Sequence, residues 1–243
     1  MTQQKADIIE RLKREILPLQ GYRSALKSGL SDMGFGPFNG AFPDGKFPLG
    51  SIHEFIACNT ENATAASGFI AAIVGSLMNK SGAAIWIGSQ LTIFPPALKS
   101  FGIEPENIIF IDLQNQKDIL WTIEEALKCD GLSAVIGELP ELSFTGSRRL
   151  QLAVEKSRVT GFILRKTSRS LSTTAAIARW NIKSLPGHVP ENLPGVGFAR
   201  WQVELLKVRN GRPGKWEVEW SDGKFHPVSK IAAILPEQKR KTG

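Results

Sequence analysis

The sequence is poor in the residues that metal chemistry requires. Among 243 residues there are only two cysteines and three histidines. Cys58 and Cys129 stand far apart, in no spacing typical of a metal site or a disulfide framework. We interpret both cysteines as small core residues rather than nucleophiles, and we expect no metal ligands.

Long hydrophobic stretches are absent as well. A helix that spans a bilayer needs about 20 apolar residues, whereas the most apolar stretch, residues 68–78, has 11. The N-terminus, MTQQKADIIERLKREI, carries acidic residues and lacks the apolar core of a signal peptide. The sequence therefore predicts a protein without a membrane partner and with a cytoplasmic location.

Charge is unevenly distributed along the chain. Residues 1–142 contain 11 Lys/Arg against 16 Asp/Glu, a net of −5, whereas residues 143–243 contain 19 against 7, a net of +12. No acidic residue stands between Glu155 and Glu191. Such a stretch suits a polyanion such as nucleic acid, and it suits a solvated basic face equally well. Its basic residues are Lys156, Arg158, Arg165, Lys166, Arg169, Arg179 and Lys183.

Short β-like runs alternate with helical periodicity from residue 51 onward. The runs are residues 51–57, 83–87, 108–112, 134–137 and 160–165, and the helical patterns are 64–79, 95–101, 117–128 and 145–156. This alternation predicts an α/β fold, with a mostly parallel sheet covered by helices on both faces. Later runs, residues 178–183, 198–209 and 216–220, have no helices between them and predict a C-terminal β-hairpin region with its turn at residues 210–214.

The chain divides into one main domain and its flanking segments. Residues 1–18 are predicted to form an N-terminal amphipathic helix, with apolar residues from Ile8 to Ile16 at helical spacing. Residues 19–50 are an irregular lead-in rich in glycine and proline near its end. We expect the core domain to cover residues 51–225 and residues 226–243 to be a partly disordered tail.

A phosphate-binding loop is expected between the strand 51–57 and the following helix, but its chemistry is missing. Such a loop needs glycines, a lysine for the phosphates and a hydroxyl for Mg²⁺. Residues 62–68 instead contain NATAASG, without lysine. Asn62, Thr64 and Ser67 therefore define a degenerate nucleotide site, whose hydroxyls can cap a helix or hold a weakly bound anion. ATP and Mg²⁺ are disfavoured, and we expect no cofactor.

Two other positions support the loss of phosphoryl-transfer chemistry. Gln90 follows the second strand, where an ATPase places a water-activating glutamate, and an amide cannot act as a general base. Glu138 ends the strand at 134–137, where a metal-binding aspartate often lies, but we favour a turn or helix cap as its role. We therefore predict no catalytic residues.

One stretch does satisfy the spacing of a phosphate loop. Residues 40–46, GAFPDGK, match G-x-x-x-x-G-K, but Phe47 stands where the hydroxyl belongs. Pro43 lies inside the stretch, and Pro48 occupies the place where a helix should begin. The preceding strand and following helix that would support the match are absent from the pattern.

The order of motifs resembles the ImuA family of SOS-mutagenesis proteins, which is itself similar to the RecA recombinase core and to the cell-division inhibitor SulA. The resemblance covers residues 1–225, and its most specific pieces are LWTIEEAL at 120–127, SRRLQLA at 147–153 and RNGRPGKW at 209–216. It implies a RecA-like fold, in which residues 51–57 precede the Walker A position and residues 134–138 are the Walker B strand. Gln90 then replaces the catalytic glutamate, and residues 166–178 resemble the second DNA-binding loop.

The resemblance also implies a function. Members of this family have a non-catalytic accessory role in error-prone translesion DNA synthesis during the SOS DNA-damage response. The implied partners are an ImuB-type Y-family polymerase-like protein, an error-prone C-family DNA polymerase and RecA. Two alternatives stay open: a DNA-stimulated ATPase that uses GAFPDGK, and a SulA-like inhibitor, which the charge asymmetry and the length through residue 220 disfavour.

Single-stranded DNA is a further candidate partner, through basic residues in the acid-free stretch and at the hairpin end. Trp180 can stack on a base or lie half-buried in a strand. Trp121 is predicted to be a core residue, and Arg148 and Arg149 a solvated helix end rather than a partner contact. The candidate nucleic-acid residues are Arg165, Lys166, Arg169, Arg179, Lys183, Arg209, Arg212 and Lys215.

Overall fold

The computed structural model describes residues 35–43, 45–78, 82–91, 93–167, 172–187 and 197–228. The helix predicted at residues 1–18, the tail beyond residue 228 and Arg169 lie outside the described residues. None of the helices in the described ranges is long and apolar enough to cross a membrane.

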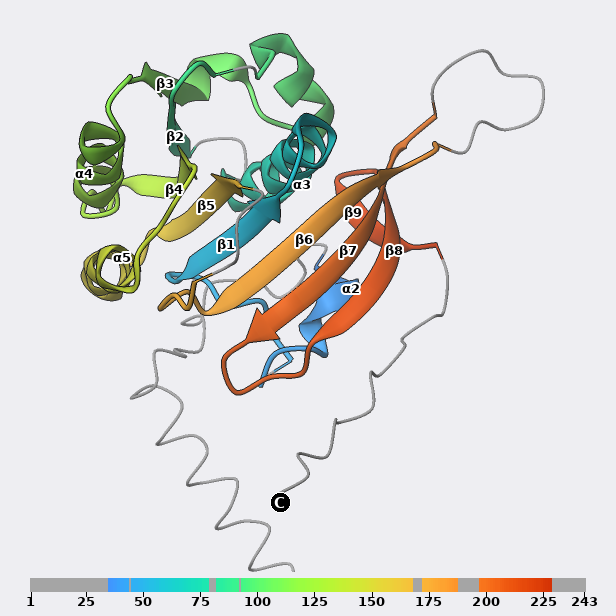
Figure 1. Cartoon of the computed structure of the whole chain (residues 1–243). Helices are drawn as coiled ribbons and strands as arrows, with labels where there is room; N and C mark the ends of the chain where they lie inside the picture. Colours follow the sequence, from blue (N-terminus) through green and yellow to red (C-terminus); the bar gives the residue numbers. More distant parts are fainter. Residues whose placement is uncertain are drawn as a thin grey trace, which may run out of the picture.

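The strands form one nine-stranded sheet in the order β3-β2-β4-β5-β1-β6-β7-β8-β9. The six strands from β3 to β6 in this order are parallel, and β7, β8 and β9 continue the sheet in antiparallel pairing (Figure 1). The fold is therefore the mostly parallel α/β sheet with a C-terminal hairpin region that the alternation predicts. The strands are β1 Ile52–Ala57, β2 Ala83–Gly88, β3 Ile108–Asp112, β4 Leu132–Leu139, β5 Thr160–Lys166, β6 Ala178–Leu185, β7 Ala199–Val208, β8 Gly214–Ser221 and β9 Lys224–Pro227.

Helices cover both faces of the parallel part. Helix α3 packs on one face, with Phe69, Ile70 and Ile73 fully buried, whereas α4 and α5 lie side by side on the other (Figure 1). The sheet thus separates two hydrophobic clusters. The helical elements are α2 Gly36–Asn39, α3 Thr60–Met78, α4 Gln116–Ala126 and α5 Phe144–Ser157, with 3-10 helices η1 Pro95–Phe101 and η2 Pro105–Asn107.

The core on the α3 side is unusually aromatic. Trp180 is fully buried, and its ring centroid lies about 6.1 Å from those of Phe38, Phe47 and Phe55. Two of these phenylalanines belong to the lead-in, so the end of that segment is part of the core. Burial removes Trp180 from any base-stacking role, which corrects one of the two interpretations above.

Several local predictions are wrong. Trp121 is 60% exposed, because α4 turns Ile119, Ile123 and Ala126 toward the sheet and leaves Trp121 on the opposite side. Both cysteines are exposed as well, since each follows the end of an element rather than lying inside one. The sheet extends to Pro227, past the predicted start of the tail.

Candidate functional site

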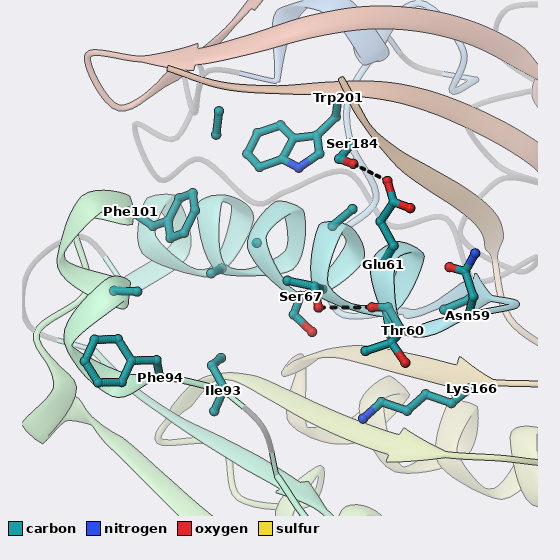
Figure 2. A pocket seen from close by; sticks show the side chains of 18 of the residues that line it. Asn59, Thr60, Glu61, Ser67, Ile93, Phe94, Phe101, Lys166, Ser184 and Trp201 are labelled. Carbon is teal, nitrogen blue, oxygen red and sulfur yellow. Dashed lines mark hydrogen bonds between the residues drawn. The ribbon is translucent and has the colours of Figure 1, made fainter. Parts of the chain in front are cut away.

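A cleft of about 1220 Å³ lies at the carboxyl ends of the parallel strands, where open α/β sheets usually place their ligands. Phe101 and Trp201 of β7 lie next to each other on one side of α3, with ring centroids 6.3 Å apart, and Phe94 lines the other side (Figure 2). The first turns of α3 line the cleft as well, and Lys166 projects from the end of β5. The cleft therefore combines an apolar portion with a polar end.

The connection from β1 to α3 is short. The strand ends at Ala57 and the helix begins at Thr60, so only Cys58 and Asn59 connect them. The Asn59 side chain accepts a hydrogen bond from the backbone N–H of Asn62 at 2.8 Å and so caps the helix. Backbone amides that would cradle phosphates in a longer loop are here part of the helix.

The early start of α3 changes the place of the predicted nucleotide-site residues. The sequence predicts the helix from about residue 64, whereas Asn62, Thr64 and Ser67 all lie inside it. Thr64 and Ser67 line the cleft, and the Thr64 hydroxyl donates to the backbone carbonyl of Thr60 at 3.0 Å. Glu61, in the first turn, places a carboxylate where an anionic ligand would bind.

The predicted Gln90 and Glu138 lie near the same edge of the sheet. Gln90 lines the cleft with φ of 52°, and its backbone N–H donates to the Asp112 carboxylate at 3.0 Å. Glu138 is only 6% exposed and accepts a hydrogen bond from Trp86 Nε1 at 2.8 Å. Its other oxygen lies 2.5 Å from Lys166 Nζ. Glu138 is therefore the buried partner of a cation, not a turn or helix cap.

A second buried carboxylate, Glu54 of β1, neutralises two of the candidate nucleic-acid residues. Glu54 is fully buried, and its oxygens lie 2.7 Å from Arg165 NH1 and 2.7 Å from Arg179 Nε. Thr174 donates a further hydrogen bond at 2.8 Å. Arg165 is only 3% exposed, so it is not a surface residue available to DNA. Basic residues of the acid-free stretch thus pair with carboxylates of β1 and β4.

Consecutive positions on β5 point to opposite faces of the sheet. Arg165 therefore meets Glu54 on one face, while Lys166 meets Glu138 on the face that carries α3. This alternation separates two candidate residues that are neighbours in the sequence.

Three basic side chains hold the segment that precedes β6. Arg179, Lys207 and Arg209 donate to the backbone carbonyls of residues 172, 174 and 175, at 2.7, 3.3 and 2.9 Å respectively. Burial lowers the pKa of Lys207, the positive charges of Arg179 and Arg209 lower it further, and Glu54 partly offsets them. Sequence reasoning missed Lys207, because only the β6–β7 register of the folded sheet places it opposite Arg179.

The other candidate residues lie apart from this cluster. Lys183 is exposed on β6, and Arg212 and Lys215 are exposed at the β7–β8 hairpin. The backbone N–H of Arg212 donates to the carbonyl of Ala41 at 2.8 Å, which ties the hairpin to the lead-in. The structure therefore brings Arg165 and Arg179 together at Glu54, places Arg209 against the segment before β6, and leaves the other described candidates dispersed.

Fold and site together define the class: an α/β protein of the RecA-like kind, with a cleft at the carboxyl edge and a two-residue connection in the phosphate-loop position. No family model matches the chain. Protein ImuA of two Caulobacter vibrioides strains is 31% identical to it over 201 residues, which is 78% of this chain and 82% of that protein. The chain belongs to the ImuA family, as the motif order predicts.

Cell division inhibitor SulA shows a shorter similarity. The SulA of Photorhabdus laumondii is 30% identical over 95 residues, 39% of this chain and 54% of that protein. The SulA of Yersinia pestis is 27% identical over 116 residues, 48% of this chain and 68% of that protein.

Proposed function

We propose that this protein is a non-catalytic accessory factor of error-prone translesion DNA synthesis in the SOS response. The observation that carries the proposal is the two-residue connection between β1 and α3, which leaves no backbone cradle for nucleotide phosphates. Membership of the ImuA family supports the SOS context. In this proposal the fold retains its rigid sheet and surfaces while its nucleotide chemistry is lost.

The electrostatics of the cleft support the absence of a nucleotide. Lys166 and Arg200 are cations that line the cleft; the ammonium of Lys166 is already paired with buried Glu138, and Arg200 Nε lies 3.8 Å from a Glu219 oxygen. A triphosphate would have to separate the Lys166–Glu138 pair and approach the carboxylate of Glu61. Both steps oppose binding, because a partly buried charge that loses its partner costs free energy and because the phosphates and the Glu61 carboxylate repel each other.

The GAFPDGK stretch offers no better cradle. The backbone amides of Ala41, Phe42 and Gly45 donate to the carbonyls of residues 38, 39 and 42, and the Phe42 and Phe47 side chains are buried. These amides are not free to face phosphates. A DNA-stimulated ATPase that uses Lys46 therefore stays the weaker alternative.

The proposed partners are an ImuB-type Y-family polymerase-like protein, an error-prone C-family DNA polymerase and RecA. The role predicts that deleting the gene lowers the frequency of mutations induced by DNA damage, and that the wild-type chain restores it. Restoration by Lys46→Ala to the same level supports a non-catalytic role. Undiminished mutagenesis in the deletion strain contradicts the proposal.

Single-stranded DNA is a proposed direct ligand through the exposed lysines. Lys183 and Lys215 are exposed, so charge reversal at both should leave the fold intact. Each lost phosphate contact should reduce the slope of log affinity against log salt by about 0.7. Fluorescence anisotropy with an oligonucleotide measures this slope, with Lys117→Glu on α4 as the matched control. An unchanged slope and affinity in the double variant contradict this DNA contact.

A SulA-like inhibitor is the second candidate, because the similarity to SulA covers up to 48% of this chain. The remaining sequence, and the basic C-terminal part in particular, favours the accessory role. Expression in dividing cells discriminates the two, since an inhibitor produces filaments and an accessory factor does not.

A further inference from the structure

Three large apolar side chains are exposed on the outer side of α4 and α5. Trp121 is 60% exposed, Phe144 57% and Leu152 50%. The sheet does not need them, because each helix already buries its own apolar side in the second hydrophobic cluster. Clustered exposed apolar residues on a soluble domain commonly mark an interaction surface.

The two helices present these residues on one surface. Helices α4 and α5 lie side by side (Figure 1), and the guanidinium of Arg149 pairs with the Glu124 carboxylate between them. On α5, residues four apart are neighbours on the helix surface. Phe144, Arg148, Leu152 and Lys156 therefore form a continuous stripe on the side opposite the buried residues. We call this stripe, together with Trp121, the α4–α5 surface.

The charged side chains of the stripe itself, Arg148 and Lys156, are both positive, and exposed Glu155 stands beside them on α5. Glu124 pairs with Arg149, and Glu125 lies 2.6 Å from Lys128 Nζ, so these carboxylates are already compensated. Arg148 and Lys156 form no ion pair with any residue in the described ranges. Two unpaired cations thus stand one helical turn on either side of Leu152. Charges of this kind complement an acidic ligand.

We propose that the α4–α5 surface docks an acidic segment of a protein partner that carries bulky apolar side chains. Trp121, Phe144 and Leu152 supply the apolar contacts, and Arg148 and Lys156 meet the carboxylates of the segment. Tryptophan and arginine are the residue types that most often dominate such interfaces. The proposal rests on the proposed accessory role only in assuming a protein partner.

Nucleic acid fits this surface less well. Leu152, between the two cations, has no flat face for base stacking, so stacking is left to Phe144 at the end of the stripe and Trp121 on α4. A helix or strand with alternating apolar and acidic side chains satisfies both features of the surface.

A displayed library of random peptides about 16 residues long, selected on the immobilised full-length protein, tests the proposal. The expected peptides carry net negative charge and at least two bulky apolar residues. A synthetic copy, labelled for fluorescence anisotropy, should bind at least about tenfold more weakly to Leu152→Asp and to Arg148→Glu. Trp121→Ser provides a third variant, and thermal unfolding should be near wild type in all three because the side chains are exposed.

Phe94→Ser is the matched control, since Phe94 is 68% exposed but lies at the cleft. Enrichment of uncharged or basic peptides, no enrichment, or binding indifferent to Leu152→Asp and Arg148→Glu would overturn the proposal. Binding that depends on Phe94 locates the ligand in the cleft and overturns it too. An oligonucleotide that displaces the peptide and is sensitive only to Arg148→Glu assigns the surface to nucleic acid instead. Damage-induced mutagenesis tests the accessory role separately, so the docking proposal and the accessory role can each fail while the other holds.

Discussion

Replacing Glu54 by glutamine tests whether the buried carboxylate organises the sheet beneath the acid-free stretch. Glu54→Gln keeps the size of the side chain and its ability to accept a hydrogen bond from Thr174. It removes the negative charge that faces Arg165 and Arg179, each at 2.7 Å. Arg165, with 4% of its side chain exposed, then stays charged in the interior without a partner.

The magnitude follows from the burial of the pair. Removing one partner of a buried ion pair costs about 3–5 kcal/mol, because the other charge is left uncompensated. Arg179 is more accessible, with 11% of its side chain exposed, and can turn toward water at smaller cost. Domains of this size lose about 2–4 °C of melting temperature per kcal/mol, so the loss should be about 6–20 °C.

Thermal and urea unfolding of the full chain measure the effect. Glu61→Gln is the matched control, because Glu61 is exposed and makes one hydrogen bond, with the Ser184 hydroxyl. Its cost should stay below about 1 kcal/mol. A loss below about 1 kcal/mol for Glu54→Gln as well would refute the reasoning, since the arginines would then not depend on this carboxylate.

Two further predictions concern the core. Burial lowers the pKa of His53 from 6.5 to about 4, so the unfolded chain binds a proton that the folded protein excludes. The free energy of unfolding should therefore fall as pH drops from 6.5 toward 4, by up to about 3 kcal/mol. Urea unfolding of His53→Phe at a series of pH values should not show this decrease. The same slope of unfolding free energy against pH in both proteins would contradict the prediction. A Cβ on Gly75 would lie 2.0 Å from the Phe101 carbonyl oxygen, whereas one on Gly68 would lie 3.5 Å from Trp201. Gly75→Ala should destabilise by about 1–3 kcal/mol and Gly68→Ala should be neutral or stabilising by up to about 1 kcal/mol; equal unfolding midpoints would argue against the close approach of α3 and η1.

The sheet was predictable because its strands are short apolar runs with strong periodicity. The observed bounds of strand β3 are the predicted ones. The observed bounds of helix α4 differ from the predicted bounds by one or two residues. The start of α3 was missed because its first turn is polar. Asn59 as a cap and Glu61 in the first turn were the available signals. The exposure of Trp121 was also predictable, since the positions two residues before and after it carry the buried side of the helix.

The charge environment was not predictable from local sequence. Arg165 pairs with Glu54, which is 111 residues away in the sequence, and Lys166 pairs with Glu138 on the neighbouring strand β4. Only the sheet order brings these groups together, and a single sequence does not reveal that order. A stretch without acids is therefore weak evidence for a nucleic-acid surface in a parallel sheet. The same limitation applies to Lys207, whose neighbours come from two other segments.

Nucleotide binding and turnover by the purified protein test the central claim most directly. Both are measured with and without single-stranded DNA, with Lys46→Ala as control. The account predicts no binding at millimolar ATP and no turnover in either protein, because no cradle of backbone amides exists between β1 and α3. DNA-stimulated turnover that disappears in Lys46→Ala would make the protein an ATPase and contradict the account.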